Sequence, residues 1–338
     1  MMMKDEMMKS CTLCQRGCRA DRTIRAGRCG GTDQILAARA AIHMWEEPCI
    51  SGKEGSGTVF FAGCPLGCVF CQNHEIAPGI GAFKDYGRKK SEEGEKNDDL
   101  RVLTEEELAA VFLSLQEQRA NNINLVTPTH YVPQIIEAVR KAREQGLHIP
   151  VLYNTGSYET TDTVDKLDGI VDIYLPDLKF YDPEVARRYA QAPDYFETAS
   201  RAIDVMIRQI EKRHAGDPRP AYDDRGMMQY GVIVRHMILP GHTKDSKRIL
   251  EYLYRTYGDS LTVSIMNQYT PMPGIERDYP ELGRKVTKRE YERVIDYALE
   301  LGFVNAYIQE GATASESFIP SFHGEGLDAC EIIKEKNR

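Results

Sequence analysis

The chain has 338 residues, of which 42% are hydrophobic, and a formal net charge of −8 at pH 7. This hydrophobic fraction supports a large core, and the acidic balance argues against nucleic acid as a partner. No apolar run approaches the ~18 residues of a membrane-spanning helix, and the first nine residues lack the apolar core of a signal peptide. We therefore expect a cytoplasmic protein with no membrane partner. Nine cysteines in a cytoplasmic chain favour metal binding over disulfides, and eight of them precede residue 72.

The first cysteine block has the spacing C-x2-C-x3-C-x10-C and is interleaved with five arginines; its members are Cys11, Cys14, Cys18 and Cys29. Four thiols can close a tetrahedral metal site, and a segment with so few large apolar residues needs such a staple. We predict a small metal-binding knuckle. Structural zinc and an auxiliary [4Fe–4S] cluster both remain open, as does an unfolded arm with free thiols. Cys49 follows alone, in a linker that runs to residue 52, and is expected to be a packed side chain.

The second cysteine block follows the buried strand expected at 58–62 and has the spacing C-x3-C-x2-C, through Cys64, Cys68 and Cys71. Three thiolates can hold a [4Fe–4S] cluster and leave one of its four irons without a protein ligand. An open coordination position is typical of a catalytic metal site. Zinc, a plain electron-transfer site or unrelated buried thiols are the alternatives.

Strands and helices then alternate along the chain. The expected strands after the first are 123–126, 151–153, 170–175, 230–239, 261–266 and a weaker one at 305–308. The expected helices are 104–119, 133–145, a short one around 164–167, 182–189, 195–212, 246–257 and 287–301, and residues 84–100 are expected to be an exposed insertion. Such alternation predicts parallel strands with crossover helices, and no G-x-G-x-x-G motif supports a dinucleotide fold.

A complete or partial (β/α) barrel fits this pattern better. In such barrels the functional residues gather at the carboxyl ends of the strands. Polar residues follow the expected strands at 127–130, 154–155, 177–179 and 267–268, and the second cysteine block lies at the end of the first. The sequence therefore predicts one site, facing all of these strand ends.

The second cysteine block, with Phe70 before its last cysteine, resembles the signature of the radical S-adenosylmethionine (SAM) superfamily. Other motifs are similar to the PflX-like branch, which comprises uncharacterised homologues of pyruvate formate-lyase activating enzyme. These motifs are the first cysteine block and residues 45–48, 71–73, 124–130, 153–155, 177–179 and 235–241. The resemblance implies an α/β protein with a partial, TIM-like (β/α)6 barrel of the radical SAM type.

It also implies that Cys64, Cys68 and Cys71 hold a [4Fe–4S] cluster whose open iron binds SAM. The residues expected near SAM are Phe70, Asn73, Thr127, Thr129, His130, Asn154, Thr155, Asp177, Lys179 and Arg235. Activating enzymes carry a G-G-E-P stretch after the second strand, where this chain has Thr127-Pro128-Thr129-His130. That difference leaves open how the SAM amino group is oriented. No residue is assigned to the hydrogen-abstraction step itself.

The resemblance further implies an anaerobic oxidoreductase or lyase-type enzyme that takes electrons from an external flavodoxin or ferredoxin. Its radical would act on a partner protein, as in glycyl-radical activation, or on a small molecule, a peptide or RNA. A non-catalytic iron–sulfur or zinc protein is the alternative from another class. The expected division is a cysteine-rich segment at 1–52, the core barrel at 53–315 and a tail at 316–338.

Overall fold

The structure is a computed structural model that describes residues 7–77, 100–309, 320 and 322–328. The insertion expected at 84–100 lies outside the described residues except for Leu100, as does most of the tail expected at 316–338. The proposed domain boundaries stay predictions.

Seven parallel strands form the core of the sheet, in the order β10-β9-β8-β6-β5-β4-β2. Their bounds are β2 Ser56–Phe61, β4 Ile123–Val126, β5 Val151–Thr155, β6 Ile173–Pro176, β8 Met228–Met237, β9 Thr262–Met266 and β10 Ala306–Ile308. All residues of β2, β4, β5 and β6 are buried, as is usual for parallel strands covered on both faces. The strands expected from the sequence are confirmed to within a few residues at each end.

Three further strands were not expected from the sequence. β1 (Ile35–His43) pairs antiparallel with β2, β3 (Arg101–Leu103) pairs antiparallel with β1, and the two-residue β7 (Ala221–Tyr222) pairs with β8. β1 contains four alanines, which disfavour strands when considered alone. Its pairing on both sides and the complete burial of Ala37 and Ala38 override that preference.

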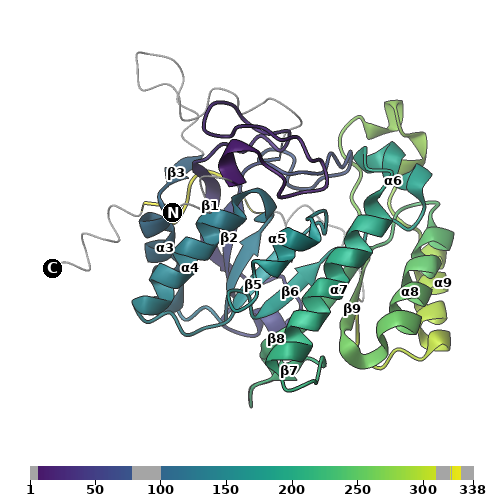
Figure 1. The fold of residues 1–338 in the computed structure, drawn as a ribbon. Helices are drawn as coiled ribbons and strands as arrows, with labels where there is room; N and C mark the ends of the chain where they lie inside the picture. Colours follow the sequence, from purple (N-terminus) through teal and green to yellow (C-terminus); the bar gives the residue numbers. More distant parts are fainter. Residues whose placement is uncertain (1–6, 78–99, 310–319, 321, 329–338) are drawn as a thin grey trace.

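Helices cover the outer face of the sheet (Figure 1). The main ones are α3 Glu105–Glu117, α4 Val132–Glu144, α5 Thr161–Asp165, α6 Pro183–Ala190, α7 Tyr195–Arg213, α8 Thr243–Tyr257 and α9 Lys288–Leu301. Short 3-10 turns occur at Thr129–Tyr131, Gly258–Ser260, Ile275–Arg277 and Pro280–Leu282. Thr104 forms the expected N-cap of α3, within a capping box with Glu107. Helices between parallel strands confirm the α/β barrel architecture.

The linker before β2 enters the barrel. Its short helix α2 (Pro48–Ser51) places Cys49 and Ile50 in an apolar cluster with residues of β5, β6 and β8; these are Leu152, Ile173, Leu175, Met228 and Ile233. Cys49 is 4% exposed and is a packed residue, as expected. Because strand residues two apart share a face, Asn154, Asp177 and Arg235 lie on the same side as this cluster, one step further along their strands. α2 thus closes the barrel beneath a layer of polar side chains.

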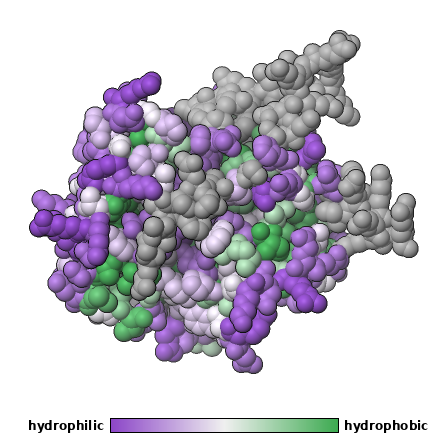
Figure 2. Space-filling view, turned by 180° about the vertical axis from the view of Figure 1, so that it is seen from behind, coloured by the Kyte–Doolittle hydropathy of each residue, from purple (hydrophilic) through white to green (hydrophobic). Residues whose placement is uncertain are grey.

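The cysteine-rich segment lies across the carboxyl ends of the strands. Figure 1 shows this N-terminal segment passing above the sheet towards α6. On the face seen in Figure 2, hydrophobic residues form small separate patches among hydrophilic ones. Among the described residues, no helix is both long and apolar enough to cross a membrane.

Candidate active site at the carboxyl ends of the strands

The loop after β2 carries Cys64, Cys68 and Cys71 into a cavity of about 460 Å³. Two features set its course. Gly63 has φ +94°, a left-handed conformation that favours glycine, and a Cβ there would lie 2.6 Å from the carbonyl oxygen of Cys29. The amide of Val69 donates to the carbonyl of Tyr189 at 2.9 Å. All three cysteines line the cavity, as the spacing predicts.

The cavity also collects most of the residues predicted to lie near SAM. Those that line it are Phe70, Asn73, Thr127, Thr129, Asn154, Thr155, Asp177, Lys179 and Arg235. They come from loops and strand ends of β2, β4, β5, β6 and β8, which meet because the strands are parallel. Gln268, from the polar stretch after β9, lines it as well.

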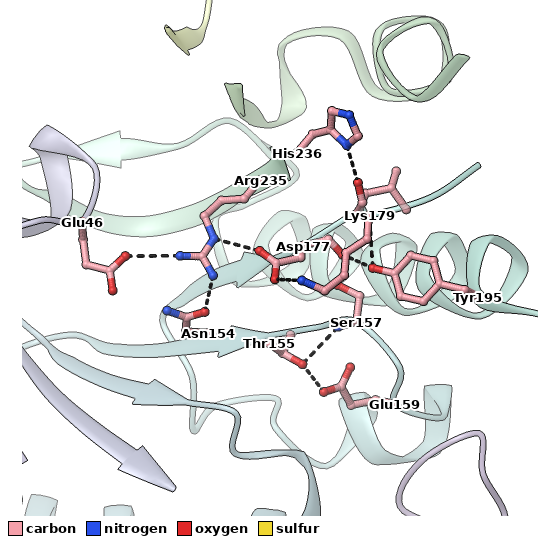
Figure 3. A network of polar contacts seen from close by, with 11 residues as sticks. Glu46, Asn154, Thr155, Ser157, Glu159, Asp177, Lys179, Tyr195, Arg235 and His236 are labelled. Carbon is pink, nitrogen blue, oxygen red and sulfur yellow. Dashed lines mark hydrogen bonds and ion pairs between the residues drawn. The ribbon is translucent and has the colours of Figure 1, made fainter. Parts of the chain in front are cut away.

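A chain of alternating charges runs along the cavity wall (Figure 3). The Arg235 guanidinium donates through Nε to Asp177 Oδ1 at 2.9 Å and lies 3.3 Å, through Nη1, from Glu46 Oε2. Asp177 Oδ2 accepts from Lys179 Nζ at 2.5 Å, and Asn154 Oδ1 accepts from Arg235 at 2.5 Å. Because the side chains of these four charged residues are at most 22% exposed, their charges are poorly screened and their mutual geometry is fixed.

Electrostatics keep this wall ionised. Burial by itself would raise the pKa of Asp177, but Arg235 and Lys179 hold it below its usual value. Burial opposes protonation of Lys179, yet Asp177 and the nearby Cys68 raise the pKa of Lys179 above its usual value. The site therefore presents fixed positive groups beside a carboxylate over the whole physiological pH range.

The buried carboxyl of Glu159 organises the ends of β4 and β5. Its Oε1 accepts hydrogen bonds from Thr129 at 2.6 Å, from Tyr153 at 3.2 Å and from Thr155. Burial raises the pKa of Glu159. Within the described residues its Oε2 has no hydrogen-bond partner. Glu159 thus fixes the hydroxyl groups of Thr129 and Thr155, two of the residues predicted to lie near SAM.

The segment that replaces the G-G-E-P stretch has an unusual backbone. Thr127 has φ +57°, a left-handed conformation that is uncommon for a β-branched residue and is typical of functional sites. Its amide donates to the carbonyl of Asn154 at 2.9 Å. His130, by contrast, does not line the cavity: it is 2% exposed, and its Nε2 contacts the carbonyl of Ala62 at 2.8 Å. Burial, together with the charge of Arg22, lowers the pKa of His130 to about 3.

The three thiols of the loop suit a metal cluster by their chemistry. Burial raises the pKa of Cys64, Cys68 and Cys71, that of Cys68 to about 12. Lys179 acts against burial at all three positions and favours the thiolate. Coordination to iron deprotonates a thiol outright and removes this cost. The residues present therefore fit a cluster that is bound on the cavity wall.

The four cysteines of the first block lie close enough together for their charges to interact. Burial raises the pKa of Cys14 to about 12, and the charge of Cys29 adds to the effect, with smaller additions from Cys11 and Cys18. A Cβ on Gly27 would lie 3.5 Å from Cys29 Sγ and 3.6 Å from Cys18 Sγ, so the glycine keeps the space beside these sulfurs free. Within the described ranges, no set of three or more Cys, His, Asp or Glu is arranged to hold a single metal ion.

The linker before β2 contributes to the cavity, which the sequence patterns did not predict. His43, Trp45 and Glu46 line it, and Glu46 is an ion-pair partner of Arg235. Glu46 also accepts from Asn124 Nδ2 at 2.9 Å. Two adjacent glutamates before a proline were visible in the sequence. Nothing in their spacing indicated that this segment enters the barrel.

The sequence profile of the radical SAM superfamily matches residues 58–216, which include the cysteine loop, β4, β5 and β6. This segment of the chain is thus similar to the radical SAM superfamily. An uncharacterised protein of Methanocaldococcus jannaschii is 26% identical over 295 residues, which cover 86% of this chain and 75% of that protein.

Two solved structures are also similar. One is a domain of pyruvate-formate lyase-activating enzyme from Bacteroides vulgatus, with 14% identity and a TM-score of 0.37. The match covers 53% of this chain and 92% of that domain. The other is HydG, a maturase of the [FeFe]-hydrogenase, with 13% identity and a TM-score of 0.44. That match covers 81% of this chain and 56% of HydG.

Proposed function

We propose that this chain is a radical SAM enzyme that cleaves SAM reductively and uses the resulting radical to abstract hydrogen from a substrate. A [4Fe–4S] cluster, when bound, supplies the electron that breaks the sulfonium bond to give methionine and a 5′-deoxyadenosyl radical. The observation that carries the proposal is the cavity itself, in which three cysteine thiols face a wall of paired charges. A non-catalytic iron–sulfur or zinc site does not need such a wall.

The chain's own residues hold the reactants. Cys64, Cys68 and Cys71 are the cluster ligands. Arg235, fixed by Asp177, presents a guanidinium suited to a carboxylate such as that of the methionyl end of SAM. The volume of about 460 Å³ is within the range of small-molecule pockets, so SAM binding would exclude most water.

The substrate is a protein in our first hypothesis, in which a glycyl radical is installed on a partner as in pyruvate formate-lyase activation. The resemblance to the PflX-like branch supports this hypothesis, together with an oxidoreductase or lyase-type reaction, an anaerobic cytoplasmic setting and an external flavodoxin or ferredoxin. A small molecule, a peptide or RNA is the second hypothesis. The altered stretch at 127–130, where Thr127 adopts a left-handed conformation, favours it because the site departs there from the activating enzymes.

We also propose that Cys11, Cys14, Cys18 and Cys29 hold a second metal centre, either zinc or an auxiliary [4Fe–4S] cluster. The mutual electrostatic influence of the four thiols and the space beside Gly27 support it. Four thiolates are a ligand set common to both centres.

The test is anaerobic reconstitution with iron, sulfide and dithionite, followed by incubation with SAM. The wild-type protein should release 5′-deoxyadenosine and methionine. Cys68→Ala should lose this activity by at least ~100-fold, because one iron loses its protein ligand. Cys49→Ala, at a buried cysteine outside the cavity, is the matched control and should retain activity. Absence of 5′-deoxyadenosine from the wild type, or equal yields from wild type and Cys68→Ala, would sink the proposal.

A further inference from the structure

The cysteine-rich segment forms direct hydrogen bonds with the loop that carries the catalytic cysteines. The amide of Cys64 donates to the carbonyl of Cys29 at 3.0 Å. The Arg16 guanidinium donates through Nε to the carbonyl of Pro65 at 2.9 Å and through Nη2 to the carbonyl of Ala190 at 3.0 Å. The charge of Arg16 is among those that lower the pKa of Cys68. The segment is therefore hydrogen-bonded to the backbone of the loop that carries the catalytic thiols, at Cys64 and at Pro65.

The same segment also carries exposed basic side chains. Arg19, Arg25 and Arg28, which we call the arginine patch, are all exposed. Arg28 also reaches Gln191, a residue of the cavity wall, with Nη2 at 3.4 Å from Oε1. Within the part of the chain that the structure describes, none of the three arginines forms an ion pair.

The charge of this segment is opposite to that of the rest of the chain. Residues 9–34 contain six Lys or Arg and two Asp, a formal charge of +4, so the remaining residues carry −12. Arginines that served only to offset metal-bound thiolates would lie close to the sulfurs. Arg22 is placed inward in this way. It is 1% exposed, and its charge acts against burial, which raises the pKa of Cys29. The side chains of the arginine patch are instead exposed, and Ile24, which lies between Arg19 and Arg25 in the chain, is 62% exposed. Exposed arginines and apolar side chains in one segment are typical of protein interfaces.

We propose that the arginine patch is the docking surface for an acidic one-electron carrier protein, which delivers the electron to the catalytic site through the Cys29–Cys64 contact. The inference rests on the proposed function and identifies where its electron donor binds. An acidic protein would be steered to this positively charged segment, which lies beside the catalytic loop, because the rest of the chain carries a net charge of −12. In the step itself the carrier would be oxidised by one electron and a cluster held by Cys64, Cys68 and Cys71 would be reduced by one, with no bond or proton transferred.

The experiment uses the full chain and an acidic [2Fe–2S] ferredoxin as the probe. Binding is measured by surface immobilisation at several ionic strengths, and 5′-deoxyadenosine formation is measured separately with reduced ferredoxin and with dithionite. Arg19→Glu/Arg25→Glu should weaken ferredoxin binding at low salt by about tenfold or more. It should slow ferredoxin-driven turnover while leaving dithionite-driven turnover unchanged, because neither arginine lies in the cavity. The affinity of the wild type should fall as salt rises.

Arg289→Glu/Arg293→Glu is the matched control, since both arginines are exposed on α9 and the change in net charge is identical. It should weaken binding by no more than about twofold, through net charge alone. Equal losses in the two double variants, or full affinity in Arg19→Glu/Arg25→Glu, would overturn the proposed surface. If even dithionite yields no 5′-deoxyadenosine from the wild type, the proposed function fails instead, whereas the binding measurement still decides the docking surface.

Discussion

Arg235 illustrates how single residues from distant segments make this site. It contacts Asp177 after β6, Asn154 on β5 and Glu46 from the linker before α2. A guanidinium presents its donors in a rigid fork, so three acceptors hold it in one orientation. Asn154 and Asp177 lie at the ends of neighbouring strands, whereas Glu46 comes from the linker before α2. The orientation of Arg235 therefore depends on a residue 189 positions away in the chain.

Replacing Glu46 tests that dependence. Glu46→Gln keeps the shape but removes the charge that faces Arg235. We expect the free energy of unfolding to fall by about 2 kcal/mol, less than for a fully buried pair because the side chains of Glu46 and Arg235 are 10% and 16% exposed. SAM affinity, measured by equilibrium dialysis on the reconstituted protein, should fall by about tenfold, equivalent to ~1.4 kcal/mol. Glu54→Gln, at an exposed glutamate, should change neither quantity. Unaltered stability and affinity in Glu46→Gln would show that Arg235 is held without Glu46.

His236, next to Arg235, gives a prediction about pH. Its Nδ1 contacts the carbonyl of Leu178 at 2.8 Å and its Nε2 contacts Ser246 Oγ at 2.9 Å. Burial lowers its pKa to about 4, against 6.5 for an unperturbed histidine. Between these values the unfolded chain binds the extra proton and the folded chain does not, so folding is increasingly disfavoured as pH falls from 6.5 to 4.

His236→Gln should remove this contribution. The slope of unfolding free energy against pH, from urea denaturation between pH 4.5 and 6, should decrease by about 1 kcal/mol per pH unit. The variant will also lose some stability at pH 7, since a buried hydrogen bond is disturbed, but that loss does not depend on pH in this window. Parallel curves for wild type and variant would contradict the assignment of a neutral buried imidazole.

At the scale of elements, α2 has an influence larger than its four residues suggest. It places Ile50, which is completely buried, against the inner faces of β5, β6 and β8, directly beneath the layer of polar residues. The same linker carries Glu46 into the cavity. The apolar residues of α2 therefore pack inside the barrel directly below the polar residues of the candidate active site.

Ile50→Ala should cost about 3 kcal/mol of unfolding free energy, because it leaves a cavity that the surrounding strands cannot fill. The matched control is Ile24→Ala, at an isoleucine that is 62% exposed, which should change the stability by less than ~0.5 kcal/mol. Both are measured by chemical denaturation of the metal-free protein. Similar costs for the two variants would mean that α2 does not pack inside the barrel in solution.

At the scale of the whole molecule, the cysteine-rich segment is the first described part of the chain, yet it contacts loops that follow three strands of the barrel. It is bonded to the loops after β2, β4 and β5: Cys29 contacts Cys64, Arg22 donates to the carbonyl of His130, and Gln15 donates to the carbonyl of Tyr158 at 3.1 Å. A metal centre in this segment would fix all of these contacts at once. We therefore expect that the metal content of each of the two proposed sites can be measured separately, although these contacts join the two sites in the structure.

Gly27→Ala tests the metal site of the first cysteine block without removing a cysteine ligand. Its φ lies outside the left-handed region and the new Cβ meets ordinary contact distances, so the metal-free fold should tolerate the change. The methyl group occupies space beside Cys18 and Cys29 that a bound metal needs. In a Cys64→Ala/Cys68→Ala/Cys71→Ala background, residual metal should be about four irons or one zinc, and Gly27→Ala should reduce it by more than half, as measured by elemental analysis. An undiminished metal content would place the metal away from Gly27.

The sequence by itself determined the elements whose residues act locally. The helix N-cap at Thr104, the buried parallel strands and the cysteine loop after β2 follow from spacing, capping chemistry and hydrophobic runs, all of which are properties of adjacent residues. The gathering of Asn154, Asp177 and Lys179 at one cavity was predictable as well, because the carboxyl ends of parallel strands lie at one end of a barrel, whereas Arg235 was expected there only from the family resemblance.

Only the tertiary structure decided which segments from outside the barrel complete the site. The alanine-rich residues 35–43 form a strand because β2 and β3 pair with them on both sides, and local preference does not predict this. Glu46 became a partner of Arg235 because α2 packs inside the barrel, and His130 turned away from the cavity because its ring contacts the carbonyl of Ala62. These outcomes depend on contacts between residues far apart in the chain, whose energies no local pattern of residues encodes.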